Sequence, residues 1–373
     1  MKKKTVGITG QSGFIGSFLT NFVRFVDPAG LEVIDFRESS FRSAQKLQDF
    51  VSKCDTIVHL AGMSRGDESE IYKTNIDLTN RLIDALGKTG SRSQVIFASS
   101  IHESGQSPFG RSKKESRLLL ERWAKKNRAQ FSGLVIPHVF GPFAKPFHNS
   151  AVATFCYQLA TGRRVKLINN SELKLIYIEH LILKIIEIIR KGKSERRIEI
   201  APDVRIKVSD ILEKLKSFSA LYTKQGIIPD LRCEFDINLF NTLRSYIGEN
   251  ERKVFLEKHK DSRGYFCEMA KAKSEGQFSF SSTGSGVERG NHFHTSKIER
   301  ICVIEGKAQI KIRKIGEKGT YSFLADGNRP VAIDMPIWFT HSIKNVSPKP
   351  LITTFFTNEI FDPAHPDTYH EKV

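Results

Sequence analysis

The sequence predicts an α/β domain built on a parallel sheet, followed by a second domain made of β-strands. Its 373 residues exceed the length of one ordinary core and indicate two domains. In the first half, apolar β-branched runs alternate with amphipathic stretches, a rhythm typical of parallel strands joined by helices. In the last third, short strand-like runs separated by turn residues replace that rhythm and favour a barrel or sandwich.

Each expected element follows from its local pattern. The strands of the first domain are expected at Thr5–Thr9, Leu31–Phe36, Thr56–Leu60, Val95–Ala98 and Leu134–Val139. Its helices include Phe14–Val26, Asn75–Leu86 and Ser112–Lys126. The later strands are expected at Gln277–Ser281, Glu299–Ile304, Ala308–Arg313, Val331–Asp334 and Leu351–Phe356. The polar turn Gly248–Glu251 separates the two rhythms, so we place the domains at residues 1–247 and 248–373.

Composition limits the partners that the chain can have. No apolar run approaches membrane-spanning length, and a strand rather than a signal segment follows the first lysines, so we expect a cytoplasmic protein without membrane insertion. The net charge of +17 is spread along the chain without a basic stripe. This distribution indicates no nucleic-acid partner, although an anionic small molecule is compatible with it. The five cysteines form no CxxC pair and are expected to be reduced.

Three glycines follow the first expected strand. Gly10, Gly13 and Gly16 have the spacing GxxGxxG, and Phe14 and Ile15 open the helix that comes next. Glycines at such a turn let the backbone approach a pyrophosphate, and the helix N-terminus meets its negative charge. The strand before the turn and the amphipathic helix after it supply the context that this motif requires. The segment therefore predicts a Rossmann domain that binds a nicotinamide dinucleotide.

The end of the second expected strand bears on the choice of cofactor. Asp35 would accept hydrogen bonds from the ribose hydroxyls of NAD, whereas Arg37 would pair with the 2′-phosphate of NADP. The residues alone leave both cofactors open, and either side chain can also be an ordinary surface charge.

Further segments of the first half resemble the extended short-chain dehydrogenase/reductase family, over residues 5–215. These segments are His59–Gly62, Ala98–Ser100, Lys113, Val139–Pro142 and Leu175–Glu179. The resemblance implies a nucleotide-sugar substrate and a cofactor that also contacts Leu60, Ala61, Gly62 and Lys113. It favours NADP(H), because related nucleotide-sugar reductases place an arginine where Arg37 stands.

The catalytic residues of that family match this sequence only in part. Family members have a tyrosine four residues before the lysine, and its phenol exchanges a proton with the substrate oxygen while hydride moves. Here Phe109 occupies the tyrosine position and Lys113 is present. Ser100, or Ser99 beside it, matches the serine that contacts the substrate oxygen. Phenylalanine has no exchangeable proton, so we expect an impaired reductase, with His102 as a conceivable replacement donor.

The second domain contains a histidine pattern that resembles the cupin motifs. His292, His294 and Glu299 fit the first motif, and His341 fits the second, in which Trp338 replaces a turn glycine. Histidines at i and i+2 project from one face of a strand, and Glu299 is expected on the next strand, facing them. Three imidazoles and a carboxylate suit one divalent metal, with Zn²⁺ favoured and Mn²⁺, Ni²⁺ and Fe²⁺ as alternatives. The expected fold is therefore an all-β cupin (jelly-roll) domain.

A charged segment lies upstream of the histidines. Asp261–Glu268 resembles a D-x-R-G-x-F-x-E segment of deoxysugar 3,5-epimerases, which are also cupins. The resemblance implies that its charged residues lie near the nucleotide-sugar phosphates and the reacting ring. A salt-bridged strand end is the alternative interpretation.

The order of the two domains resembles the bifunctional UDP-2-acetamido-2,6-dideoxy-L-talose synthases of the UDP-L-fucosamine pathway in capsule and O-antigen synthesis. The segments Asn149–Tyr157 and Phe361–Tyr369 resemble that family as well. The resemblance implies that the cupin epimerises C3 of a UDP-4-keto-6-deoxy-HexNAc and that the Rossmann domain reduces C4 with NADPH. It also implies a homodimer.

Two alternative functions stay open. The first is an epimerase or isomerase whose Rossmann domain binds nucleotide but no longer reduces, as Phe109 suggests. The second is a non-catalytic scaffold that binds nucleotide sugars. A complete set of metal ligands argues against the scaffold, which has no need of one.

Overall fold

The computed structural model describes residues 3–192, 194–255, 259–261, 264–266, 270–272, 276–359 and 362–373. The chain forms two compact units and passes between them several times. The first unit holds Met1–Phe140, Ala144–Ala151 and Ser171–Lys207. The second unit holds Gly141–Phe143, Val152–Asn170 and Val208–Val373. The domain boundary expected between residues 247 and 248 stays a prediction.

A six-stranded sheet forms the centre of the first unit, in the order β2-β1-β3-β4-β5-β8. Its strands are β1 Lys4–Thr9, β2 Leu31–Ile34, β3 Thr56–His59, β4 Gln94–Ser100, β5 Phe131–Ile136 and β8 Glu195–Glu199. Neighbouring strands all run parallel. The β3 strand is buried along its whole length, as is typical of a central strand in a parallel sheet. The parallel-sheet Rossmann part of the predicted fold class is confirmed.

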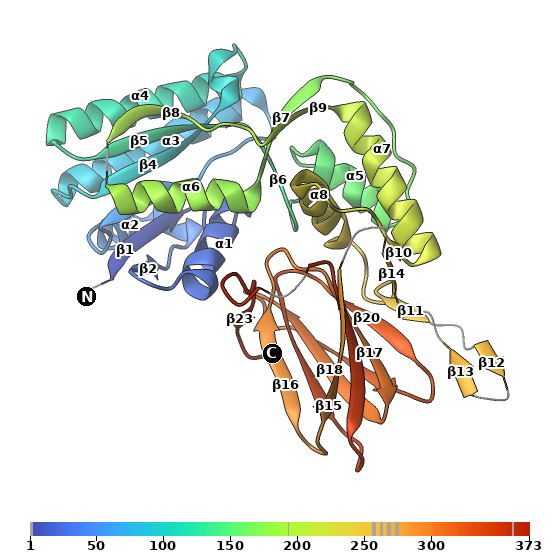
Figure 1. Cartoon of the computed structure of the whole chain (residues 1–373). Helices are drawn as coiled ribbons and strands as arrows, with labels where there is room; N and C mark the ends of the chain where they lie inside the picture. The colour runs from blue at the N-terminus through green and yellow to red at the C-terminus, as the bar shows by residue number, and fades with distance from the viewer. Residues whose placement is uncertain are drawn as a thin grey trace. The chain divides into compact units, whose positions relative to one another are not determined.

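Helices connect these strands. They are α1 Phe14–Asn21, α2 Ala44–Val51, α3 Glu68–Lys88, α4 Pro108–Asn127 and α6 Ile178–Lys191, with shorter helical turns at Phe22–Val26, Glu38–Arg42 and Ile101–Ser104. Figure 1 shows α3 beside α4, and these two helices pack on each other. The α4 helix begins at Pro108, because Ser107 Oγ accepts a hydrogen bond from Gly110 N–H and proline suits the first helical position. Phe109 and Lys113 therefore lie in the first two turns of one helix.

The expected strand Leu134–Val139 is wrong, because the structure divides it between two sheets. Its first part belongs to β5, and its last residues belong to β6 (His138–Phe140). Pro137 lies at the break, where a residue without a backbone N–H cannot continue the ladder. The β6 strand pairs in parallel with β7 (Glu172–Tyr177), and β9 (Val204–Lys207) pairs antiparallel on the other side of β7.

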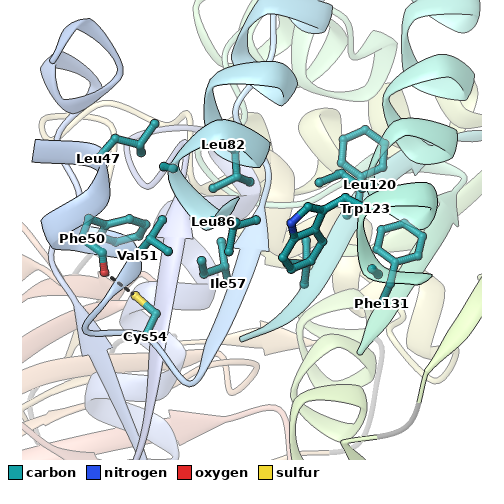
Figure 2. Close-up of a cluster of buried hydrophobic side chains, with 14 of the residues drawn as sticks. Leu47, Phe50, Val51, Cys54, Ile57, Leu82, Leu86, Leu120, Trp123 and Phe131 are labelled. Carbon is teal, nitrogen blue, oxygen red and sulfur yellow. Dashed lines mark hydrogen bonds between the residues drawn. The ribbon is translucent and has the colours of Figure 1, made fainter. Parts of the chain in front are cut away.

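The core of the first unit lies beside the parallel sheet. Figure 2 shows Leu82, Trp123 and neighbouring apolar side chains filling this cluster. Cys54 belongs to it, and its thiol donates a hydrogen bond to the Phe50 carbonyl at 3.1 Å. Burial raises the pKa of the Cys54 thiol to about 12, so this cysteine is protonated and unreactive at neutral pH.

The second unit is built on two five-stranded sheets, in the orders β11-β20-β17-β22-β15 and β19-β18-β21-β16-β23. Their strands are β11 Lys253–Phe255, β15 Gln277–Thr283, β16 Glu288–Phe293, β17 Glu299–Glu305, β18 Lys307–Lys314, β19 Thr320–Asp326, β20 Val331–Met335, β21 Phe339–Asn345, β22 Leu351–Thr357 and β23 Tyr369–His370. All pairings within these sheets are antiparallel, which confirms the all-β prediction. Apolar side chains from both sheets form one cluster that includes Ile301, Ile310 and Ile343.

The described part of the second unit also contains three helices and two small strand pairs. They are α5 Ala151–Ala160, α7 Val208–Ser219, α8 Glu234–Arg244, the pair β10 Ile227–Ile228 with β14 Lys271–Ala272, and the pair β12 His259–Asp261 with β13 Gly264–Phe266; a further helical turn spans Ala220–Lys224. The buried Arg244 attaches α8 to the sheets, because its Nη2 donates to the Met335 carbonyl at 3.2 Å. Across the described ranges, no helix has the length and apolar character needed to cross a membrane.

The core cluster makes the first unit sensitive to truncation of Leu82. We expect Leu82→Ala to lower the free energy of unfolding of this unit by about 2–5 kcal/mol, because Leu82 is fully buried and its loss leaves a cavity. The matched control is Leu118→Ala, since Leu118 is 39% exposed on α4. Urea denaturation of both variants measures the difference, and equal effects would contradict the assignment of Leu82 to the core.

Candidate functional site

The glycine turn lies at the carboxyl end of β1 and contacts the end of β3. Gly10 has a φ of +73°, and a Cβ there would lie 2.8 Å from the Ala61 nitrogen. No other residue fits this contact without a shift of the backbone. The N–H of Gly13 donates to the Gly10 carbonyl at 3.0 Å, which closes the turn.

The N-terminus of α1 follows this turn directly. Gly13 is its N-cap residue in an extended conformation, and no side chain caps the helix. The first N–H groups of a helix have no partner within the helix, so those of Phe14, Ile15 and Gly16 form a site suited to a phosphate.

The loop after β2 is attached to the glycine turn by two side chains. Gln11 Oε1 accepts a hydrogen bond from Phe36 N–H at 2.9 Å, and Ser12 Oγ donates to Glu38 Oε1 at 2.5 Å. Sequence reasoning missed both residues, because the variable positions of the motif carry no pattern. The attachment fixes the loop that holds Asp35 and Arg37.

Asp35 and Arg37 both remain exposed at this loop. The Asp35 carboxylate pairs with Arg24, although its side chain keeps 81% of its accessible area. Both are therefore accessible to a ribose or a phosphate.

The loop after β3 is held by buried polar groups. Thr9 Oγ1 accepts from Ala61 N–H at 3.3 Å and lies 2.7 Å from His59 Nδ1. Asn75 on α3 accepts from Met63 N–H at 2.6 Å and donates to the Met63 carbonyl at 2.9 Å. Asn75 therefore fixes the segment that contains Leu60, Ala61 and Gly62, and no short motif could have identified it.

Lys113 reaches the same edge of the sheet from α4. Its side chain is buried, and Nζ donates to the Ala98 carbonyl at 2.8 Å. The ammonium lies 4.9 Å from the centre of the Phe97 ring and 5.9 Å from that of Phe109. A Cβ built on Gly62 would lie 3.5 Å from Nζ, which places the lysine beside the expected cofactor loop. Burial lowers the pKa of Lys113 to about 8.

The two serines at the end of β4 differ in their surroundings. Ser99 is buried, and its Oγ donates to Glu103 Oε2 at 2.5 Å. Arg117 and Arg197 both pair with that carboxylate. Ser100 is half-buried instead, and its Oγ accepts from the backbone N–H of His102 at 3.2 Å. Ser100 is therefore the more accessible of the two hydroxyls.

A pair of histidines lies near Phe109. The His102 ring centre is 6.4 Å from that of Phe109 and 5.3 Å from that of His138. Burial, followed by the charge of His102, lowers the pKa of His138. The surroundings of Phe109 therefore include Lys113 and an exposed imidazole, but the ring itself offers no proton.

In the second unit, four side chains converge on one point. The ligand atoms of His292, His294, Glu299 and His341 all lie within 4.8 Å of one another. Glu299 Oε2 is 3.0 Å from His341 Nε2 and 3.7 Å from His294 Nε2. Burial and the neighbouring His341 lower the pKa of His292 to about 4, so its imidazole is neutral at pH 7, the form that binds metals.

A bulge in β16 sets the register of this cluster. Gly290 pairs with Ser342, but His292 pairs with His341, so Asn291 is the extra residue. Gly290 and Asn291 have φ values of +95° and +57°, and a Cβ on Gly290 would lie 2.7 Å from the His341 carbonyl. The bulge brings His292 and His341 directly opposite each other, with ring centres 4.6 Å apart.

The C-terminal tail contributes a residue that sequence reasoning did not single out for a role. The carbonyl of Asp367 lies 2.6 Å from His294 Nδ1. The charged segment Asp261–Glu268 is a different case, because Ser262, Arg263, Cys267 and Glu268 lie outside the described residues. Phe361, in the tail segment predicted by resemblance, also lies outside them.

Two sequence families match the chain. The NAD dependent epimerase/dehydratase family matches residues 6–201, and the polysaccharide biosynthesis C-terminal domain matches residues 259–369. A UDP-2-acetamido-2,6-beta-L-arabino-hexul-4-ose reductase from Pseudomonas aeruginosa is 30% identical over 368 residues, which are 97% of each chain.

Solved structures of similar fold cover the whole chain or a large part of it. The capsular polysaccharide assembling protein CapF from Staphylococcus aureus matches with a TM-score of 0.64 and 27% identity, over 99% of this chain and all of that one. A structure of RMD from Pseudomonas aeruginosa complexed with NADPH covers 65% of this chain and 99% of its own, with a TM-score of 0.56 and 16% identity, and shows the fold alone. Because the first family match spans more than half of the chain and the 30% identity extends over almost all of it, this protein belongs to the NAD dependent epimerase/dehydratase family.

Proposed function

We propose that this protein is a bifunctional nucleotide-sugar enzyme. The second unit epimerises C3 of a UDP-4-keto-6-deoxy-HexNAc, and the first unit reduces the C4 ketone with NADPH. One observation carries the proposal. Four side chains that could hold a metal ion converge on a chain that is similar over 97% of its length to a UDP-2-acetamido-2,6-beta-L-arabino-hexul-4-ose reductase. In the same proposal, the protein acts in capsule or O-antigen synthesis, is cytoplasmic and forms a homodimer.

The histidine cluster fits a divalent metal. His294 Nε2 is buried without a hydrogen-bond partner among the described residues, which is costly unless an ion or substrate engages it. Three imidazoles and one carboxylate match the donors that zinc prefers, so His292, His294, Glu299 and His341 would hold Zn²⁺ in the proposed cupin. Bound there, the metal would act as a Lewis acid towards a substrate oxygen.

Epimerisation uses the chemistry of the substrate itself. The C4 ketone acidifies the neighbouring C3–H bond and stabilises the enolate formed when that proton leaves. Return of a proton to the opposite face of C3 inverts the centre. The second unit would contribute a largely buried cluster, since His294, Glu299 and His341 are each less than one tenth exposed.

Reduction requires a hydride and a proton. NADPH, when bound, supplies the hydride to C4, and Arg37 would pair with its 2′-phosphate. Gly10, Gly13 and the first turn of α1 would bind the pyrophosphate, and Leu60, Ala61 and Gly62 would line the cofactor. Ser100 would hydrogen-bond the C4 oxygen. Lys113 would bind the cofactor next to that serine. The ring of Phe109 cannot deliver the proton, so slow reduction is expected.

A second candidate function follows from Phe109. In this alternative the barrel epimerises or isomerises the sugar, and the first unit binds NADP(H) without efficient turnover. Incubation with a UDP-4-keto-6-deoxy sugar in D₂O, with and without NADPH, separates the two by NMR. Exchange at C3 together with a new C4 alcohol supports the bifunctional enzyme, and exchange alone supports the alternative.

We expect roughly one divalent metal per chain, most of it zinc, because the cluster supplies a complete four-ligand set. His294→Ala should lose most of that metal, since a site that lacks one ligand is weak and misshapen. His365→Ala is the matched control, because the His365 side chain is 86% exposed. Elemental analysis of the three proteins measures the content, and equal metal in wild type and His294→Ala would exclude this ligand set.

Arg37→Ala should weaken NADPH binding by at least ~1.5 kcal/mol, because a charge-assisted contact to the 2′-phosphate is lost. NADH binding should stay nearly unchanged. Arg42→Ala, at another exposed arginine of the same loop region, is the control. Calorimetric titration with NADPH and with NADH measures the change in binding free energy for each cofactor. Equal losses for NADPH and NADH in Arg37→Ala would mean that Arg37 contacts no 2′-phosphate.

Phe109→Tyr should increase NADPH oxidation with a 4-keto substrate. A positioned general acid contributes about 10²–10⁴ to the rate, and the site already accommodates the ring. The control is Phe280→Tyr, which adds the same hydroxyl at a 75% exposed position of β15. Absorbance of NADPH follows the reaction. Fast oxidation by the natural protein would contradict an impaired reductase and would point to His102 or a water molecule as the donor.

A further inference from the structure

The C-terminal tail adds a strand beside the strand that carries His292. In the antiparallel pairing of β23 with β16, His370 lies opposite His292 and Tyr369 lies opposite Phe293. The rings of Phe293 and Tyr369 stack with their centres 5.4 Å apart. The tail therefore belongs to the same sheet as His292 and His341.

Asp367 precedes this strand and binds the turn that joins β16 to β17. Its Oδ1 accepts from Thr295 N–H at 2.9 Å and from Thr295 Oγ1 at 2.7 Å. Its Oδ2 accepts from the N–H groups of Ser296 at 3.0 Å and Lys297 at 2.7 Å, and from Ser296 Oγ at 3.0 Å. Three successive N–H groups thus converge on one carboxylate, an arrangement that binds anions well. The carboxylate fixes the turn between His294 and Glu299.

The backbone carbonyl of Asp367 makes a separate contact with His294. It lies 2.6 Å from Nδ1, and because a carbonyl only accepts, the hydrogen must be on the histidine nitrogen. In the neutral ring, Nε2 then carries the lone pair. That atom lies 3.7 Å from Glu299 Oε2, on the side where the four ligand atoms converge.

The conformation of Asp367 is maintained by these contacts. Its φ of +38° lies in the left-handed region, which costs energy for a residue other than glycine. The neighbouring carbonyl of Pro366 accepts from Lys297 Nζ at 2.7 Å, so the turn and the tail also bind each other through a second residue. Such a conformation persists only where the surroundings determine it.

We propose that Asp367 is a positioning residue for the metal site. Its carbonyl holds His294 in the tautomer that presents Nε2, and its carboxylate holds the turn that sets the spacing of His294 and Glu299. This inference rests on the proposed metal function of the cluster. A group that orients a metal-binding histidine typically contributes 10–100-fold to metal affinity, as a rough guide.

The test compares metal affinity and ligand geometry in Asp367 variants, with Co²⁺ as a spectroscopic probe. We expect Asp367→Ala to lower Co²⁺ affinity by about 10–100-fold and to change the visible absorption of bound Co²⁺. Asp367→Asn should lose less, because the amide keeps one acceptor oxygen and asparagine tolerates a positive φ. Asp362→Ala is the matched control, since the Asp362 side chain in the same tail is 57% exposed.

Two results would overturn the inference in different ways. Wild-type affinity and spectrum in Asp367→Ala would overturn the role of the Asp367 carboxylate and leave the metal site standing, because alanine keeps the backbone carbonyl that contacts His294. Failure of the wild-type protein to bind Co²⁺ would overturn the proposed metal function and this role with it. If the variants do not fold, ¹⁵N NMR of the Zn²⁺-loaded wild type still decides. We expect a proton on His294 Nδ1 and the metal on Nε2, and the reverse would refute the proposal.

Discussion

The parallel register of β1 against β3 is the constraint on which the first unit depends. It aligns Thr9 with His59 and so brings the turns after both strands to one edge of the sheet. Gly10 can then approach the backbone of Ala61 closely, and α1 starts beside this contact. The same sheet edge receives Lys113 and Ser100, because β4 continues the parallel register from β3. The proposed cofactor and substrate residues are neighbours for that reason.

A different device assembles the cluster of the second unit. Its ligands come from two sheets, with His292 and His341 on one and Glu299 at the start of a strand of the other. Antiparallel pairing alone would place His292 one residue out of step with His341, and the bulge at Asn291 corrects this. An extra residue in β16 is needed for the two imidazoles to lie opposite each other. The spacing of the histidine motif therefore depends on this bulge.

The sequence predicts those parts of the structure that depend on local periodicity. Alternating strands and helices, the glycine turn and the change to short strands are local signals, and the fold class follows from them. Pro137 interrupts an apolar run that otherwise looks continuous, so the division into β5 and β6 was missed. Buried polar contacts are harder to predict from the sequence. Asn75 acts on the loop at Met63, and Asp367 acts on a turn about seventy residues earlier, so only the tertiary structure reveals either role.

The interleaving of the two units limits how such a protein can be divided or recombined. The short segment Gly141–Phe143 and the helix α5 are flanked on both sides by residues of the first unit, yet they belong to the second. Phe143 packs on Phe339 with ring centres 6.0 Å apart, and Tyr157 packs on Tyr246 at 6.5 Å. A single crossover between Tyr157 and Tyr246 that exchanged the rest of the chain with that of a relative would place foreign residues against Phe143 and Tyr157. The inserted segments and the C-terminal part of the second unit are therefore coupled through packing, so exchange of one requires matching residues in the other.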